Sequence, residues 1–357
     1  MTERENCLSL LRRQGYERVP FGYACCPAII QKFHDKYGAD AKMEEVFPVV
    51  LQNAECAEGN IVPVSEWLPY YGGKEPSAGI DFIGVGHEKG SDASFHMTRM
   101  VNPLRDAKTV QDILDYPMSS YKNADLTSAK KSVQSIHDND RVSVGLMQMT
   151  IWEKSWYIRS MEELMMDMMS EDEMATVLLE RVTEQSIDMA VNYAKCGVDI
   201  LYFGDDIGMQ HTIMMSEELY CKWIKPCYKK LIDTVRAIKP DILIAYHSCG
   251  FVEPFIKHLI DLGIDILNPV QPECMDFAEI HAKYGDKLSF LGTIGTQHTM
   301  PFGTPEEVRE TVWKNLDIAG KKGGLYPEPT HMLEPEVPWE NIEAYINACR
   351  EYNTNFK

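Results

Sequence analysis

The fold is decided by the stretch "DILIAYHSCGFVEPFIKHLIDLGIDILNPV", residues 241–270. It begins with an apolar run, passes through a polar loop into an amphipathic helical pattern, and ends in a second apolar run. Short apolar runs that alternate with helices predict parallel βαβ units, with helices covering the outer face of the sheet.

This pattern repeats from about residue 139 onward. The expected strands occupy residues 141–149, 197–204, 241–248, 263–270, 287–295 and 323–329. The expected helices occupy residues 171–196, 216–238, 252–262, 276–284 and 304–320. Ser216 and Thr304 stand where N-caps are expected, and Pro305 suits a first helical position. The repeat fits either a closed barrel or an open, doubly wound sheet.

Two observations favour the closed barrel. The sequence contains neither G-x-G-x-x-G after an expected strand nor G-x-x-x-x-G-K-[ST], the usual markers of nucleotide-binding open sheets. Polar residues also follow the expected strands, at the end where barrel enzymes hold their active sites. These residues are Gln148, Asp205, Asp206, His247, Cys249, Asn268, Gln271, Thr296, Gln297, Glu328 and His331. We therefore expect an α/β fold, a single (β/α)8 TIM barrel spanning residues 1–357.

The N-terminal region, residues 1–138, is less regular and predicts an elaborated entry to the barrel. Residues 17–26, "ERVPFGYACC", are expected to supply a first strand, and residues 121–139 a helix that leads into the next strand. Residues 67–104 are rich in glycine and aromatic residues, and we expect them to form an excursion that caps the mouth of the barrel.

The amino-acid composition limits the kinds of molecule that the protein is expected to bind. The formal net charge of −19 argues against nucleic acid, because such binding depends on Lys and Arg against phosphates. No apolar run reaches the roughly 18–20 residues of a spanning helix, and the first residues lack a signal-peptide pattern, so we expect no membrane association. The ten cysteines are expected to be reduced thiols in a cytoplasmic protein, and a small molecule or another protein remains as the partner.

The stretch "YHSC" contains a candidate metal site. In an extended segment residues i and i+2 point to the same side, so His247 and Cys249 can face one cation. Zinc takes such nitrogen and sulfur ligands, and a catalytic zinc needs a third ligand from elsewhere in the chain. His331, Cys274 and Glu328 are the candidates, and a polar strand end without metal is the alternative interpretation.

Three ordered motifs carry a resemblance to a known family. Residues 245–276, beginning "AYHSCGF", residues 285–308, "GDKLSFLGTIGTQHTMPFGTPEEV", and residues 323–342, "GGLYPEPTHMLEPEVPWENI", resemble the uroporphyrinogen decarboxylase superfamily. The resemblance covers roughly residues 140–350. It implies a (β/α)8 barrel with the pocket at the carboxyl ends of the strands.

The superfamily has two branches that differ at identifiable residues. True decarboxylases hold substrate carboxylates with an arginine-rich segment near the first strand, and residues 22–38 here contain no arginine. The zinc-dependent, corrinoid-linked methyltransferases carry H-x-C followed by a late third ligand, commonly cysteine. His247 and Cys249 match the first element, and His331 stands in the place of that cysteine. The resemblance therefore implies the methyltransferase branch, of the O-demethylase type.

The ligand set then predicts a substrate. One thiolate and two imidazoles leave zinc with net positive charge, which suits the departure of an alkoxide or phenoxide. We expect methyl transfer from a methoxylated aromatic substrate to Co(I) of a separate corrinoid protein. The chain lacks D-x-H-x-x-G, so cobalamin must arrive on that partner. The alternatives are methyl transfer to a thiol of the coenzyme M type, a decarboxylase, and a binding barrel with no catalytic metal.

Further residues receive roles around this centre. Asp205 and Asp206 are expected to donate a proton to the departing oxygen or to bond a ligand imidazole, with a capping role as the alternative. The candidates for substrate binding are Gln148, Tyr202, Gln210, Tyr246, Gln271, Gln297 and Glu328. A place in the core is the stronger expectation for the two tyrosines.

Overall fold

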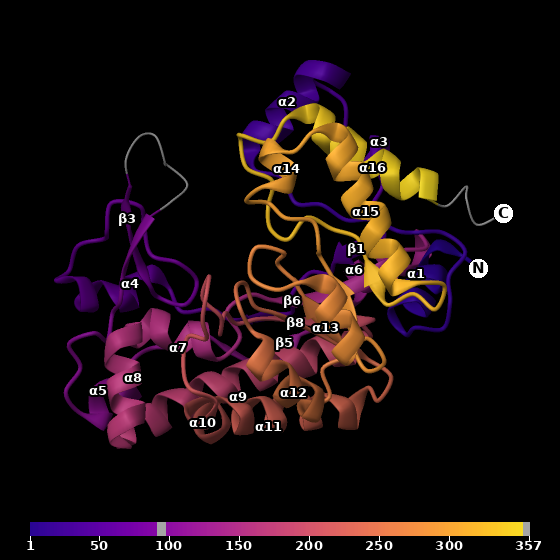
Figure 1. Ribbon diagram of the computed structural model, residues 1–357. Coiled ribbons are helices and arrows are strands. Elements are labelled where there is room, and N and C mark those ends of the chain that lie inside the picture. The colour runs from indigo at the N-terminus through magenta and orange to yellow at the C-terminus, as the bar shows by residue number, and fades with distance from the viewer. Residues whose placement is uncertain (91–97, 353–357) are drawn as a thin grey trace.

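One curled sheet of seven parallel strands organises the computed structural model, which describes residues 1–90 and 98–352 (Figure 1). In sheet order the strands are β1 (Leu51–Asn53), β6 (Val142–Met147), β7 (Ile200–Gly204), β8 (Leu243–His247), β9 (Ile266–Asn268), β10 (Ser289–Leu291) and β11 (Leu325–Tyr326). All neighbouring pairs are parallel, so their carboxyl ends meet at one edge. The predicted barrel-like α/β class is confirmed.

Helices cover the outer face of this sheet. Those that follow its strands are α7 (Trp152–Arg159), α8 (Met161–Ser170), α9 (Glu173–Cys196), α10 (Glu217–Leu219), η3 (Tyr220–Ile224), α11 (Lys225–Ile238), α12 (Glu253–Leu262), α13 (Phe277–Tyr284), α14 (Thr299–Phe302), α15 (Pro305–Ala319) and α16 (Trp339–Tyr352). The earlier helices are α1 (Glu3–Leu11), α2 (Pro27–Tyr37), α3 (Met43–Val46), α4 (Val64–Trp67), η1 (Leu68–Tyr71), α5 (Val110–Asp115) and α6 (Thr127–Asp138).

The predicted helix starts are confirmed. The Thr304 side chain accepts a hydrogen bond from Glu307 N, the Glu307 carboxylate accepts one from Thr304 N, and Pro305 is the first residue of the helix. Ser216 caps α10 by accepting from Leu219 N at 3.1 Å. Each cap satisfies a backbone N–H that the first helical turn leaves without a partner.

The number of strands differs from the predicted eight. Within the described residues, the sheet runs from β1 to β11 with seven strands. The expected first strand, residues 17–26, lies beside the end of β11 but makes one isolated bridge, Cys25 to Leu333. Gly22 N also donates to Pro327 O at 3.1 Å. Pro20 has no N–H to donate, which limits a regular ladder in this segment.

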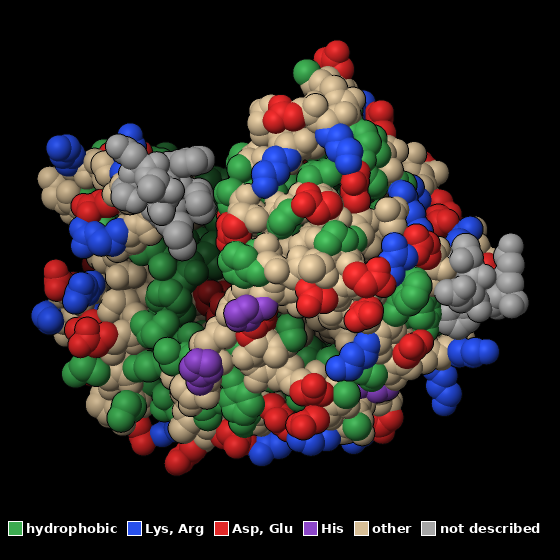
Figure 2. Space-filling view, turned by 45° about the horizontal axis from the view of Figure 1, so that its top comes forward, with side chains coloured by type: hydrophobic (Ala, Val, Ile, Leu, Met, Phe, Trp, Pro, Cys, Tyr) green, Lys and Arg blue, Asp and Glu red, His purple; other side chains and the backbone are tan. Residues whose placement is uncertain are grey.

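Two small antiparallel pairs belong to the N-terminal excursion. They join β2 (Glu58–Asn60) to β5 (Ser120–Asp125) and β3 (Gly86–Lys89) to β4 (Thr98–Val101). Part of the expected excursion, residues 91–97, lies outside the described residues. Figure 2 shows a deep hollow between the lobe that carries β3 and the lobe that carries α14, with hydrophobic side chains on its wall. The mouth-capping role of the excursion stays a prediction.

The opposite end of the sheet is closed by α1. Its Cys7, Leu8, Leu10 and Leu11 pack in one cluster with residues of the strands, including Val142. Burial of such aliphatic side chains is the main favourable term in folding, so α1 is part of the core. Among the described residues, no helix combines the length and apolar character needed to cross a bilayer.

Candidate metal centre

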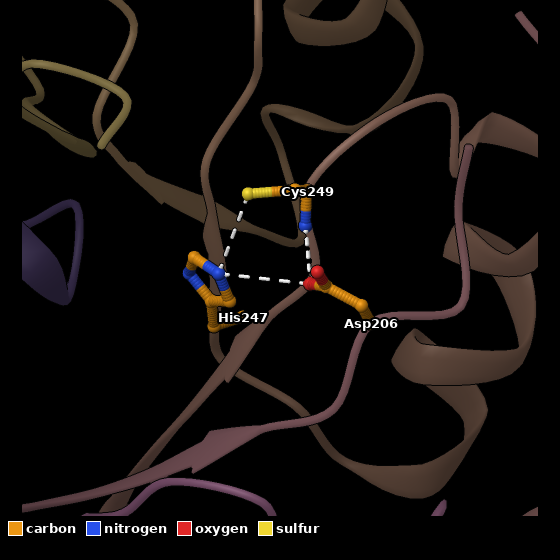
Figure 3. Close-up of side chains that lie close together, drawn as sticks. All are labelled: Asp206, His247 and Cys249. Carbon is orange, nitrogen blue, oxygen red and sulfur yellow. Dashed lines mark hydrogen bonds and ion pairs between the residues drawn. The ribbon is translucent and has the colours of Figure 1, made fainter. Parts of the chain in front are cut away.

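His247, Cys249 and Asp206 meet at the carboxyl ends of two neighbouring strands (Figure 3). His247 ends β8, and its strand register places it beside Gly204, the last residue of β7, so the loops that follow lie together. His247 Nε2 lies 3.5 Å from Cys249 Sγ and 3.7 Å from Asp206 Oδ1. Cys249 N donates to Asp206 Oδ1 at 2.8 Å, which fixes the carboxylate.

Asn268 orients the His247 ring. Asn268 Nδ2 donates to Leu291 O at 2.9 Å, so its Oδ1 faces His247 Nδ1 at 2.5 Å and accepts from it. Tyr202 donates its hydroxyl to the same Oδ1 at 2.6 Å. Burial lowers the pKa of His247 despite the Asp206 carboxylate. The neutral ring with its proton on Nδ1 presents the Nε2 lone pair to the centre.

The three side chains fit a zinc ion. Tetrahedral ligands at about 2.0–2.3 Å from zinc lie roughly 3.3–3.8 Å from one another. The separations of His247 Nε2 from Cys249 Sγ and from Asp206 Oδ1, 3.5 and 3.7 Å, fall in that interval. Without metal, burial and the Asp206 carboxylate raise the pKa of the Cys249 thiol to about 12. A cation would favour the thiolate, since coordinated thiols are deprotonated.

The remaining predicted ligands lie around this group. His331 is exposed and lines the same cavities as His247 and Cys249, but it is not in the group whose ligand atoms lie within 4.8 Å of one another. Cys274 and Glu328 are also outside that group. The sequence placed Asp206 in a proton-transfer or supporting role, whereas the structure brings it into direct ligand distance. Ligation by His331 stays a prediction.

Asp205 points away from the centre and is fully buried. Its Oδ2 accepts from Ile151 N at 2.9 Å, Trp152 N at 2.7 Å and Tyr228 OH at 2.6 Å. Its Oδ1 accepts from Glu153 N at 2.9 Å. These are the N–H groups that open α7, so the geometry of Asp205 matches the capping alternative, and its predicted catalytic role is not supported by a contact with the cavity.

A cavity of about 660 Å³ lies inside the curled sheet, beside the centre. Its apolar floor is formed by inward-facing residues of six strands, namely Leu51, Val144, Ile200, Ala245, Ile266 and Leu291. Its polar wall includes His247, Asp206, Gln148, Tyr202 and Glu328, all of which the sequence singled out. The arrangement suits a molecule with an apolar body and few polar groups.

Glu153 is a cavity residue that the sequence reasoning missed. It lies in the first turn of α7 and lines the cavity, where its carboxylate accepts from Tyr157 OH at 3.2 Å. Burial, together with the carboxylates of Asp205 and Asp206, raises its pKa to about 8. A signal was available, because Glu153 closely follows the end of β6, where barrel loops carry functional residues.

The other predicted substrate residues fall into two sets. Gln210, Gln271 and Gln297 line a neighbouring cavity of about 320 Å³, which Cys249 also lines. Gln210 and Gln297 bond each other through their amides, and Gln271 accepts from Gly250 N at 3.0 Å. Tyr246 is fully buried, and its ring packs on Tyr228, which agrees with the expectation of a core role.

Comparison with known proteins shows the family of the chain. Residues 80–352 match the family model described as uroporphyrinogen decarboxylase (URO-D). Because the match covers more than half of its residues, the chain belongs to the URO-D family.

Individual relatives narrow the comparison. A methylated-thiol–coenzyme M methyltransferase of Methanosarcina mazei is 28% identical over 181 residues, which are 47% of this chain and 43% of that protein. A uroporphyrinogen decarboxylase of Rickettsia massiliae is 26% identical over 185 residues, 51% of each chain. The matches span about half the length of these curated relatives. The solved structure of a methyltransferase from Methanosarcina mazei covers 99% of both chains with a TM-score of 0.67 and 14% identity, which supports the fold.

Proposed function

We propose that this chain is a zinc-dependent methyltransferase that moves a methyl group between a thiol sulfur and the cobalt of a corrinoid carried by a separate protein. The observation that carries the proposal is the group of His247, Cys249 and Asp206 beside a cavity of about 660 Å³. The Methanosarcina relative, whose name describes transfer between methylated thiols and coenzyme M, supports the reaction class.

The identity of the third ligand favours a thiol over a methyl ether. One thiolate, one carboxylate and one neutral imidazole give zinc no formal net charge. The set with His331 in place of Asp206 would leave one positive charge. A thiol needs only to be ionised, whereas an ether needs stronger stabilisation of its leaving group. Bound zinc would supply the positive charge that favours a substrate thiolate.

The residues of the chain act around that sulfur. Asn268 and Tyr202 hold His247 in the tautomer that presents Nε2, and the apolar floor excludes water from the reacting atoms. When the methyl group moves to the sulfur, a carbon–sulfur bond forms and the carbon–cobalt bond breaks. Its electron pair stays on cobalt as Co(I). The reverse direction reverses each change.

Removal of methyl groups from methoxylated aromatic compounds is the second candidate. Glu153 favours it, because a cavity carboxyl group bonded to Tyr157 could protonate a departing oxygen. A decarboxylase acting on a polycarboxylate is not favoured, since none of the described residues that line the cavity is Lys or Arg.

Zinc content and activity test the proposal together. Purified without chelator, the protein is expected to hold about one zinc per chain. His247→Ala should lose it, whereas His298→Ala, on an exposed loop, should keep it. Methyl transfer from a methylated corrinoid protein is then measured with thiols, and the reverse reaction with methylated thiols and methoxyarenes. Less than about one tenth zinc per chain, or methoxyarene activity alone, would contradict the thiol assignment.

A further inference from the structure

The cavity has an acidic wall, and among the described residues the basic side chains that line it are two histidines, His247 and His331. Glu153, Asp206 and Glu328 contribute carboxyl groups to this wall, and the lining residues that the structure describes include no Lys or Arg. Asp206 belongs to the candidate metal ligands, where the cation would balance it. Glu153 has Tyr157 as a donor at 3.2 Å. Glu328 remains as the carboxyl group whose balancing partner is missing.

Glu328 follows β11 and lines the cavity. Its Oε1 lies close to the backbone of Gly22, where a Cβ atom would come within 3.0 Å of it. Among the described residues, its carboxyl group makes no hydrogen bond and no ion pair. Burial raises its pKa to about 7, as expected for a carboxyl group in a poorly solvated site.

The hydroxyl groups around Glu328 are already used elsewhere. Tyr202, Tyr326 and Tyr345 all interact electrostatically with Glu328. Their hydroxyls donate to Asn268 Oδ1, to Phe21 O, and to Gly22 O and Pro327 O, respectively. None of these hydroxyls donates to Glu328, so its carboxyl group is free to bond a molecule in the cavity, and a cation there would favour its charged form.

We propose that Glu328 binds a cationic group of the substrate, so that the cavity takes a thiol or methylated thiol with an ammonium group at its far end. This inference rests on the proposed function and names its substrate class. The lining of the same cavity also includes the aliphatic side chains of Ala245 on β8, Ile266 on β9 and Leu291 on β10. A short aliphatic chain suits this surface, and a sulfonate or carboxylate near Glu328 and Glu153 would find no Lys or Arg among the described lining residues.

A matched series of thiols tests the proposal. Cysteamine, 2-mercaptoethanol and 2-mercaptoethanesulfonate share a two-carbon chain and end in a cation, a neutral group and an anion. Their binding to the cobalt(II)-substituted protein is followed by the thiolate-to-cobalt absorption band. We expect cysteamine to bind most tightly. Glu328→Gln should reduce its advantage over the sulfonate about tenfold or more, as loss of a charge-assisted contact predicts.

The control is Glu336→Gln, an exposed carboxylate of the same loop, which should leave the ratio unchanged. Sulfonate binding as tight as that of cysteamine, or an unchanged ratio in Glu328→Gln, overturns the proposal. If no thiol perturbs the cobalt band, the thiol substrate fails, and tetramethylammonium decides the charge preference. A rise in Tm with this ion that is lost in Glu328→Gln supports the cation site, and no rise overturns it.

Discussion

Asn268 decides which nitrogen His247 offers to the metal centre. Its amide is held by Leu291 O, so its oxygen must accept from His247 Nδ1. The hydroxyl of Tyr202 donates to the same oxygen and limits its rotation. The Nε2 atom therefore faces Cys249 and Asp206 without a bound metal. Metal binding then loses less side-chain entropy, because the His247 ring is already held in its ligand orientation.

Asn268→Ala is expected to weaken zinc binding about 10- to 100-fold, because the His247 ring loses the acceptor that fixes its tautomer and orientation. Titration with a competing zinc chelator measures the affinity. Asn192→Ala is the matched control, since it also removes a buried amide that donates to a backbone carbonyl, here Tyr121 O. Equal zinc affinity in the two variants would show that Asn268 does not position the ligand.

At the scale of the element, α7 depends on Asp205. The carboxylate accepts from three consecutive backbone N–H groups at the start of this helix and from Tyr228. Negative charge at a helix N-terminus also interacts favourably with the helix dipole. The two adjacent aspartates therefore have different roles: Asp205 caps the N-terminus of α7, and Asp206 lies beside His247 and Cys249.

Asp205→Asn is expected to lower the free energy of unfolding by about 2–4 kcal/mol. The amide carries no negative charge, and its NH₂ group would face backbone N–H donors that the carboxylate now accepts from. Asp206→Asn should change it by less than about 1 kcal/mol but lose zinc. Denaturant unfolding of the metal-free proteins measures the first effect, and elemental analysis the second. Comparable destabilisation by both substitutions would contradict this division of roles.

The confirmed structural predictions came from patterns between residues close together in the sequence. His247 and Cys249 could be paired from the sequence because alternation along a strand brings residues i and i+2 to one side. The helix cap at Thr304 could also be predicted, because its hydrogen-bond partner Glu307 lies three residues further along the chain. Asp206 as a candidate ligand depends instead on the register of β7 against β8, which pairs Gly204 with His247. No local pattern encodes that register.

At the scale of the whole molecule, the carboxyl and amino ends of the parallel strands have different structural roles. The carboxyl ends carry the cavity and the candidate metal ligands, while α1 closes the amino ends. The irregular segments were the hardest to predict. Residues 17–26 make an isolated bridge in place of the expected strand, and the position of His331 depends on the loop after β11, so its ligation stays a prediction. Such placements depend on contacts between distant parts of the chain.

Asp199 joins α1 to the amino end of the sheet. Arg4 Nε donates to its Oδ2 at 3.0 Å, and Ser143 N donates to the same oxygen at 3.0 Å. His137 Nε2 lies 3.1 Å away. Burial by itself would raise the pKa of Asp199, but the Arg4 and Ser143 hydrogen bonds outweigh it, and the pKa is lowered.

A lowered pKa in the folded state means that the contribution of Asp199 to stability is fully present above the unfolded value of about 3.9 and is lost as the pH falls through the folded value. Asp199→Asn should therefore be less stable than the parent by about 1–3 kcal/mol at pH 7. The gap should shrink as the pH falls below about 4. Chemical denaturation from pH 7 to about 2.5 measures it, with Asp233→Asn, an exposed partner of Lys229, as the control. A gap that keeps its size across that range would mean that the charge of Asp199 does not hold α1 against the sheet.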